Sequence, residues 1–509
     1  MTRPTPVTPI DAPSGEVVDQ LGGTLVDVDA ALRRRLADVC AEVTDDPGER
    51  AEAGRDWWPL AIGWASRGRV PARPAVVARP TDTAQVAAVL AACNEAGVPV
   101  TPAGGRSGVC GASVPLHGGV ALDCCGLAGV SDVDTVSLVA DVRAGTFGPD
   151  LEAELRGASG VTLGHWPQSM DLSTVGGWLA CRGAGQYSNR YGKIEDMVIG
   201  LEAVLADGTV VHTGGRGPRS ATGPDLTQLF VGSEGTLGVI TEGRFRVHPV
   251  PAGGGRRAFG FASFADGLEA CRRILRRGAT PAVLRLYDGT ESGRSFELPD
   301  TNVLIVLDEA DPVLVTATLR VVDEECAGAA RLDDGLVERW LGHRNDVSAL
   351  APLWRNGVVV DTVEVSARWA ALPGLYRSVV DTLGGLEGTL AASSHQSHAY
   401  TDGACLYFTF AGRPPESADD ATGAWAEAYY VAAWDAVTGA VDAAGGAISH
   451  HHGIGLNRGR FLPGTLGDAF AVLGAVKAAL DPKGILNPGK LGLTSAFGPA
   501  PWPAGGGGR

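Results

Sequence analysis

The sequence predicts an α+β fold in two main domains, with the second domain built on an antiparallel sheet. Its 509 residues exceed what one hydrophobic core accommodates, so the chain is expected to divide. Helix and strand patterns mix in the N-terminal half, until the proline–glycine run from Pro249 to Gly255 interrupts them. Beyond this run, helical stretches alternate with β runs, an order typical of α+β domains.

The clearest helix of the first half covers residues 84–96, where apolar residues recur with a helical period. Thr81 to Thr83 forms its start signal and Gly97 its stop signal. Shorter helices are expected at 28–40 and 150–156. Strands are predicted at 98–101 and 120–123, more β structure at 130–142, and a hairpin at 198–211 that turns at Asp207 and Gly208.

The second half predicts helices at 264–277, 369–383 and 421–443, and β runs at 301–307, 358–365 and 404–410. A last helix at 469–480 precedes a turn at 481–488. We therefore expect an N-terminal extension with helices (1–70), a first domain (71–250), a second domain (251–448), a C-terminal loop and helix (449–495) and a flexible tail (496–509).

The formal net charge is −16. A sequence-independent nucleic-acid binder needs a basic surface, so we exclude nucleic acid as a partner. An anionic substrate stays possible, because a few local arginines build a positive pocket on an acidic protein.

The nine cysteines contain no CxxC pair, which is typical of buried thiols in a reducing compartment. No apolar run has the length of a membrane-spanning helix, and we expect a cytoplasmic protein. Peripheral contact with a membrane stays open, and residues 28–60, with Trp57 and Trp58, are where we would look for it.

Glycine-rich loops are the most informative feature of the chain. Two of them cover residues 164–177 and 231–241, and a third covers 102–108. Glycine lets backbone N–H groups approach a ligand closely, and the serine and threonine hydroxyls add hydrogen bonds. Such loops suit a large anionic cofactor, although no Rossmann glycine motif or Walker A motif is present.

These loops resemble the FAD-binding fold of vanillyl-alcohol-oxidase-type (PCMH-type) flavoenzymes. The resemblance implies a PCMH-type FAD-binding domain at 71–250 and a substrate-binding cap domain at 251–448. Some members attach FAD to a histidine where this chain has Arg106, so it implies non-covalent FAD. The implied cofactor contacts are Pro102, Ala103, Gly104, Gly105, Arg106, Ser107 and Gly108; Gln168, Ser169, Met170, Asp171, Leu172, Ser173 and Thr174; Cys181, Arg182, Gly183 and Ala184; and Glu234, Gly235, Thr236, Leu237, Gly238, Val239 and Ile240.

Within that superfamily the chain is most similar to the alkyldihydroxyacetonephosphate synthase (alkylglycerone-phosphate synthase) family, over roughly residues 70–490. The most discriminating motifs are Thr222-Gly-Pro-Asp225 and His450-His-His-Gly453. That family exchanges the acyl group of acyl-dihydroxyacetone phosphate for a fatty alcohol, and FAD N5 serves as a covalent handle. The resemblance therefore implies ether-lipid chemistry, a lipid phosphate and a fatty alcohol as substrates, and a homodimer.

Three adjacent histidines, His450, His451 and His452, offer acid, base or metal-ligand capacity. The ordinary structural explanation is a polar turn with inert rings, but the resemblance implies an active-site triplet. Tyr407 lies in an apolar run, where a core tyrosine is usually the better explanation. The resemblance makes it the acid/base group, and we expect neighbouring histidines to lower its pKa.

Arg285 and Arg355 are predicted to bind the substrate phosphate, because arginine forms paired charge-assisted hydrogen bonds. For any single arginine, the ordinary explanation is a surface ion pair. His165, just before a cofactor loop, is a further residue that could face the flavin.

A 2-hydroxyacid dehydrogenase of the D-lactate or glycolate type is the main alternative. In many of those enzymes two histidines and a glutamate bind a metal; here His398 persists, whereas Tyr407 and His451 replace the other ligands. We therefore expect no metal, since the only carboxylate ligand is lost. Residues 480–490 nevertheless resemble the dehydrogenases, and residues 456–458 lack one basic residue of the synthases. Another FAD oxidase and a non-catalytic flavoprotein stay open.

Overall fold

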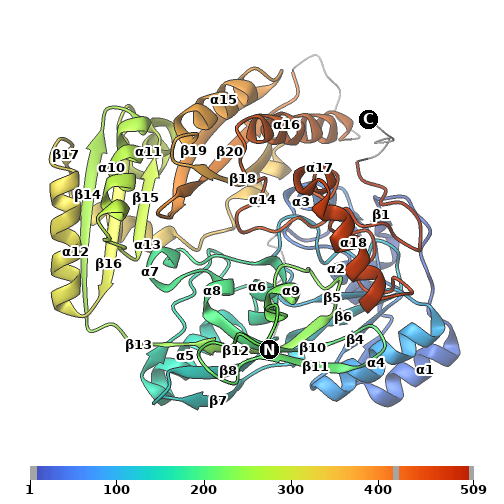
Figure 1. Cartoon of the computed structure of the whole chain (residues 1–509). Helices are drawn as coiled ribbons and strands as arrows, with labels where there is room; N and C mark the ends of the chain where they lie inside the picture. Colours follow the sequence, from blue (N-terminus) through green and yellow to red (C-terminus); the bar gives the residue numbers. More distant parts are fainter. Residues whose placement is uncertain (1–7, 416–422, 504–509) are drawn as a thin grey trace.

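The computed structural model describes residues 8–415 and 423–503 (Figure 1). An α+β architecture of two larger units is observed, as the sequence predicts. The first unit carries a four-stranded sheet in the order β2-β4-β6-β5 and a five-stranded sheet in the order β11-β10-β12-β8-β7, and the second carries a seven-stranded sheet in the order β17-β14-β16-β15-β19-β20-β18. Every pairing in the five- and seven-stranded sheets is antiparallel.

The N-terminal segment contributes short elements that pack on both units, residues 30–53 on the first and residues 59–65 on the second. They are η1 (Ser14–Glu16), β1 (Val18–Asp19), α1 (Ala30–Val39), β2 (Glu42–Thr44), α2 (Pro47–Ala53), α3 (Pro59–Ala65) and β3 (Arg69–Val70). Trp57 and Trp58 are buried, so they form no exposed patch for a membrane. Within the described residues no helix has the length and apolar character that a membrane span requires.

The first unit confirms the predicted helix at 84–96 and the hairpin at 198–211. Asp82 caps the start of α4, and Gly97 ends it in a left-handed conformation. Its elements are β4 (Val76–Arg79), α4 (Thr83–Ala96), β5 (Val100–Ala103), β6 (Val120–Asp123), η2 (Cys124–Gly126), β7 (Val130–Asp134), β8 (Val139–Arg143), α5 (Gly148–Ser159), β9 (Val161–Thr162), α6 (Val175–Cys181), α7 (Ser188–Tyr191), α8 (Ile194–Met197), β10 (Val198–Val204), β11 (Val210–Gly214), α9 (Thr227–Phe230) and β12 (Val239–Arg246).

The proline–glycine run between the units is partly regular structure. β13 (His248–Pro249) pairs with β9, and Gly253 already begins β14, which pairs with β16 over its whole length. Three consecutive glycines therefore belong to a strand and not to a linker.

The second unit confirms the predicted β runs and helices, although the first two residues of the 421–443 helix lie outside the described part. Its elements are β14 (Gly253–Phe261), α10 (Phe264–Arg276), β15 (Val283–Tyr287), α11 (Gly289–Phe296), β16 (Asn302–Ala310), α12 (Pro312–Glu325), β17 (Ala330–Arg331), α13 (Gly335–His343), α14 (Leu350–Arg355), β18 (Val359–Arg368), α15 (Leu372–Gly384), β19 (Thr389–Ala399), β20 (Gly403–Gly412) and α16 (Ala424–Ala443).

The C-terminal segment returns to the first unit through α17 (Leu462–Leu466) and α18 (Ala469–Leu480). Leu486 then bridges to Val100, the first residue of β5. The flexible tail expected at 496–509 is wrong for its first part, because Trp502 is buried between the rings of Trp58 and Trp64. Residues 504–509 lie outside the described residues.

Candidate active site

The candidate site lies on the face of the seven-stranded sheet opposite α10, α15 and α16. Leu406 and Phe408 of β20 belong to the hydrophobic core beneath those helices. Successive residues of a strand point to opposite faces, so Tyr407 is directed to the other side. By the same alternation, Leu284 and Leu286 enter the core while Arg285 faces the site.

Four polar side chains form a row across this face, one from each of four neighbouring strands. The register pairs Tyr287 with His395, His395 with Tyr407, and Tyr407 with Glu364. The His395 ring stacks between the tyrosines, with centroid distances of 5.0 Å to Tyr287 and 4.8 Å to Tyr407. The row unites residues from β15, β18, β19 and β20 in one surface.

Arg285 is held in place from two sides. Its Nη2 lies 2.6 Å from His395 Nε2, and its Nε donates to the Tyr287 hydroxyl at 3.2 Å. A guanidinium only donates hydrogen bonds, so Nε2 of His395 accepts and Nδ1 carries the proton. That Nδ1 lies 2.8 Å from a carboxylate oxygen of Glu291. Burial opposes ionisation of Glu291, but His395 and Arg294 lower the pKa of this carboxyl to about 2.

Tyr407 does not have the lowered pKa that we expected. Its hydroxyl donates to Thr362 Oγ1 at 3.0 Å, and burial raises the pKa of the phenol above its usual range. The neighbouring histidines do not offset this effect on the Tyr407 pKa. Burial also lowers the pKa of His395 and of His451, so both rings are uncharged. The geometry therefore presents Tyr407 as a protonated hydroxyl at neutral pH.

The histidine triplet reaches the same place from the C-terminal loop. The ring centroids of His451 and His452 lie 6.1 Å and 5.5 Å from that of Tyr407. His450 Nε2 is 2.6 Å from the Tyr400 hydroxyl, and its Nδ1 is 2.8 Å from His451 Nδ1. Burial lowers the pKa of His450 to about 4 and that of His451 well below its ordinary value, so both rings are neutral.

Glu364 is a site residue that sequence reasoning missed. It is 0 % exposed, and its Oε1 accepts the backbone N–H groups of all three histidines of the triplet. The available signal was an acidic residue inside an apolar β run. Arg458, the basic residue that remains in segment 456–458, is buried against this carboxylate and is not available to a phosphate.

Among the described residues, no hydrogen bond or ion pair joins Arg355 to this cluster. Its side chain is exposed at the C-terminal end of α14, and its substrate-binding role stays a prediction. Arg344 lies with Arg285 instead, and their guanidinium carbons are 5.6 Å and 5.5 Å from the Trp340 ring centroid. Little in the sequence favours Arg344 over Arg355, because the two arginines lie only eleven positions apart in the same segment.

The four segments predicted to bind the cofactor converge in the first unit. Gly105 leaves no room for a Cβ beside the Leu172 carbonyl, and Gly235 leaves none beside Pro102. Glu234 N–H donates to the Ala180 carbonyl at 2.9 Å. The loops therefore touch one another in pairs, as a shared cradle requires.

The histidine loop is tied to this cradle. The carboxylate of Glu234 accepts the N–H groups of Ile454 and Gly455, at 2.6 Å and 2.8 Å. Burial raises the pKa of Glu234 to about 7. Cofactor loop and triplet are thus held together across 220 residues of sequence.

Buried donors around the cradle fit a phosphate-bearing cofactor. Within the described residues, Arg106 Nε and Nη2 and the Ser233 hydroxyl are buried without a hydrogen-bond partner. Both ring nitrogens of His165 are also unpartnered, and burial lowers its pKa to about 3. Buried polar groups are normally paired, so these atoms indicate a polar ligand.

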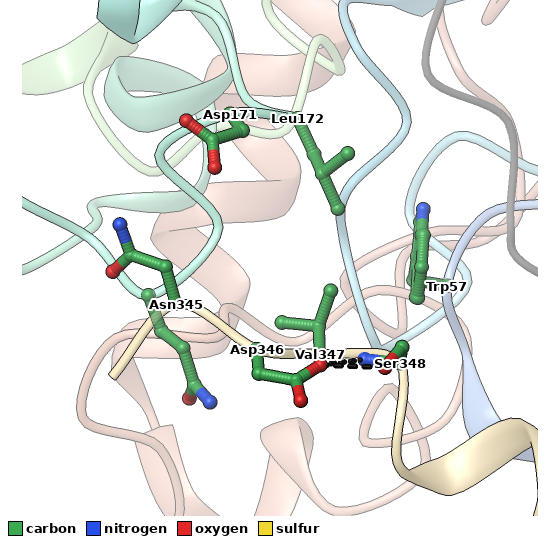
Figure 2. A pocket seen from close by; sticks show the side chains of 8 residues that line it. Trp57, Asp171, Leu172, Asn345, Asp346, Val347 and Ser348 are labelled. Atoms are coloured by element: carbon green, nitrogen blue, oxygen red, sulfur yellow. Dashed lines mark hydrogen bonds between the residues drawn. The ribbon is translucent and has the colours of Figure 1, made fainter. Parts of the chain in front are cut away.

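A pocket of about 190 Å³ opens beside the loop at 168–172 (Figure 2). Trp57, Leu172 and Val347 supply apolar surface, while Asp171 and Asp346 add carboxylates. Two carboxylates disfavour a phosphate here. Arg285 and Arg344, which share the Trp340 ring, are better candidates for an anion site.

His398 joins the triplet in a group that could hold a metal ion. One nitrogen from each of His398, His450 and His451 lies within 4.8 Å of the others. The expectation of no metal rested on the lost carboxylate; the structure shows that three imidazoles meet without it. His398 Nδ1 also lies 2.8 Å from the Ser188 hydroxyl.

Fold and site together define a flavoenzyme of the PCMH-type class. A model described as "FAD binding domain" matches residues 74–214, and one described as "FAD linked oxidases, C-terminal domain" matches residues 257–491. The chain is 32% identical over 441 residues to the uncharacterized FAD-linked oxidoreductase YgcU of Escherichia coli O157:H7, covering 82% of this chain and 89% of that protein. It belongs to the FAD-linked oxidase family, and its cofactor is FAD.

Relatives with different activities are similarly close. Alkyldihydroxyacetonephosphate synthase of Dictyostelium discoideum is 29% identical over 83% of this chain and 74% of its own length. The glycolate oxidase subunit GlcD of Bacillus subtilis is 27% identical over 82% of this chain and 89% of its own. A solved alkyldihydroxyacetonephosphate synthase has the same fold, with a TM-score of 0.77 at 24% identity over 96% of this chain and 89% of that one.

Proposed function

We propose that this enzyme exchanges the acyl group of an acyl-dihydroxyacetone phosphate for a fatty alcohol, as an alkylglycerone-phosphate synthase does. The observation that carries the proposal is the row across the sheet. It sets the Tyr407 phenol beside a buried arginine system on one side and the histidine triplet on the other. By family analogy the substrates are a lipid phosphate and a fatty alcohol, and the enzyme is a homodimer.

Each residue has a role that its contacts support. Arg285 and Arg344 hold the phosphate, because both are cations beside the Trp340 ring. Tyr407 exchanges the proton at the substrate carbon: its phenol is protonated at neutral pH, so it first passes that proton to an imidazole of the triplet and then takes the one from the carbon. The triplet also positions the leaving acyl group. FAD, when bound, supplies the electrophile, and Arg106 at the family's attachment position leaves it non-covalent.

A 2-hydroxyacid dehydrogenase is the second candidate, and the group formed by His398, His450 and His451 favours it. Three neutral imidazoles suit a borderline divalent metal such as zinc, which would bind a hydroxyacid. In that case the flavin would take electrons from the substrate and pass them to an acceptor.

The two functions are separated by mixing the FAD-loaded enzyme anaerobically with palmitoyl-dihydroxyacetone phosphate, and separately with D-lactate and D-2-hydroxyglutarate. A synthase loses flavin absorbance with the ketone phosphate, recovers it on addition of hexadecanol, and releases the alkyl ether. A dehydrogenase loses absorbance with a hydroxyacid and recovers it only with an electron acceptor. This second outcome would overturn the main proposal.

A further inference from the structure

Glu364 accepts an unusually large number of hydrogen bonds for one buried carboxylate. Its Oε1 lies 3.1 Å, 3.1 Å and 2.8 Å from the backbone nitrogens of His450, His451 and His452, and 2.9 Å from Ser449 Oγ. Successive backbone N–H groups that point at one anion form a rigid concave site. The backbone of the triplet is therefore fixed around this single oxygen.

Arg458 follows the histidine triplet in the same loop and binds the same carboxylate. Its guanidinium pairs with both oxygens of Glu364 and donates to the Ile448 carbonyl at 3.0 Å. Arg458 is 1 % exposed and lies over the Trp434 ring at 4.8 Å. Burial opposes ionisation of Glu364, but Arg458 and His452 lower the pKa of this carboxyl well below its ordinary value. It is therefore an anion throughout the working range of pH.

Within the triplet, only His452 turns a ring nitrogen toward the carboxylate. His452 Nδ1 lies 3.2 Å from Glu364 Oε2 without the alignment of a hydrogen bond, whereas Nδ1 of His450 and Nδ1 of His451 face each other at 2.8 Å. A nitrogen lone pair is repelled by an anion at this distance, so the nitrogen beside the carboxylate is the one that carries a proton. The imidazole nitrogen left for chemistry is then Nε2.

We propose that Glu364 is the positioning residue of the triplet: it fixes the loop backbone and holds His452 with its proton on Nδ1, leaving Nε2 to exchange a proton. Glu364 pairs with Tyr407 in the sheet register, and the His452 ring meets the Tyr407 ring edge to face at 5.5 Å. The same carboxylate thus sets where His452 stands relative to Tyr407. The catalytic consequence rests on the proposed function, whereas the tautomer does not.

The test is nitrogen NMR of the full-length FAD-loaded protein labelled in its ten histidines, with His452→Gln for assignment. We expect His452 to be protonated on Nδ1, and Glu364→Gln to convert it to a mixture or to the Nε2-protonated form. Glu364→Asp should restore the wild-type pattern in part. Glu152→Gln makes the same change at a buried carboxylate of α5, one bound to Thr162 and to the Leu163 backbone, and should leave His452 unchanged.

An Nε2-protonated His452 in the wild-type protein would overturn the proposal, even if Glu364→Gln does not fold. So would a folded Glu364→Gln protein, with normal flavin content, that keeps the wild-type tautomer. On the synthase assay we expect kcat to fall by on the order of 10²-fold in Glu364→Gln, with KM little changed. An inactive wild-type enzyme would refute the proposed function and leave the tautomer result standing.

Discussion

The ring of Tyr407 stacks on its neighbours, whereas its hydroxyl makes a separate hydrogen bond. A substitution that removes only the hydroxyl therefore tests its role without disturbing the stacking. We expect Tyr407→Phe to lower turnover by about 10²–10⁴-fold, since the proton-transferring group is lost. FAD content should not change, and the lost bond to Thr362 should cost about 1 kcal/mol of stability. Steady-state turnover and the ratio of flavin to protein absorbance measure both effects.

Tyr429→Phe is the matched control for that change. Its hydroxyl bonds to Thr389 and to the Ala411 carbonyl, away from the histidine triplet. Normal turnover in Tyr407→Phe, or an equal loss in Tyr429→Phe, would refute the acid/base role.

Buried neutral histidines make stability depend on pH. Burial lowers the pKa of His117 from 6.5 to about 4. The unfolded chain binds a proton below about pH 6.5 and the folded chain does not, so stability is lost as pH falls from 6.5 toward 4. The slope is about 1.4 kcal/mol per pH unit for one such group.

Comparing His117→Asn with the wild type isolates this contribution. Glu234, with its pKa raised to about 7, acts in the opposite direction, because its folded form keeps a proton that the unfolded form loses. Glu234 is present in both proteins, so its contribution to the pH dependence of stability cancels in the comparison. We expect the melting temperature of His117→Asn to fall less between pH 6.5 and 4.5; equal slopes would contradict the assignment.

At the scale of elements, close contact between loops explains why glycines matter at only some positions. A Cβ at Gly105 would collide with the Leu172 carbonyl, which joins two cofactor loops. We expect Gly105→Ala to weaken FAD binding by at least about tenfold, because backbone cannot move aside as a side chain can. Fluorescence titration of the apoprotein with FAD measures this change.

Gly157→Ala in α5 is the control, because a Cβ there meets nothing within 4 Å. It should raise stability by about 0.5–1 kcal/mol through helix propensity and leave FAD affinity unchanged. If Gly105→Ala bound FAD as tightly as the wild type, the close contact between the loops at Gly105 and Leu172 would not be needed for FAD binding, and the prediction would be wrong.

Helix α18 reverses the usual pattern, with its single charged residue buried and apolar residues exposed. Lys477 donates to the carbonyls of Thr236 and Leu486 and pairs with Asp481, whereas Val472 is 64 % exposed. Lys477→Met leaves Asp481 buried without its partner, so we expect a loss of about 3–5 kcal/mol in unfolding free energy and of FAD. Val472→Lys should cost less than about 0.5 kcal/mol in urea unfolding; similar losses in both variants would contradict this arrangement.

Strand β19 shows where pattern reading fails. Its segment Ser393–His398 is entirely polar and lies outside the β runs that the sequence predicts, yet every residue in it is buried. Hydrogen bonds from Ser393 and His395 to Glu291 satisfy part of this polar segment. A polar strand of this kind has no periodic apolar signal, because one of its faces carries the polar row of the candidate site.

The C-terminal segment joins the two units of the molecule, because Leu486 bridges to β5 of the first and Trp502 packs on α3, which lies against the second. Trp502 meets Trp58 and Trp64 with ring centroids at 5.3 Å and 5.7 Å and is 7 % exposed. We expect Trp502→Ala to lower the free energy of unfolding by about 3–5 kcal/mol through the cavity that it leaves. Chemical denaturation measures this loss.

Trp502→Phe, which retains an aromatic ring, should lose markedly less. A Trp502→Ala protein as stable as the wild type would restore the picture of a free tail. Sequence reasoning missed this contact because a lone tryptophan among prolines and glycines has no periodic neighbours.

Local periodicity predicts most of the helices and strands in their order, and the glycine-rich loops point to the flavoenzyme family because they resemble those of known members. Which polar residues meet depends on how distant segments pack together. The fold places Arg344 and Arg285 beside the same Trp340 ring, and it sets Glu364 under a triplet 86 residues away. Strand register and contacts between loops bring these residues together, and neither can be predicted from the spacing of residues within one segment.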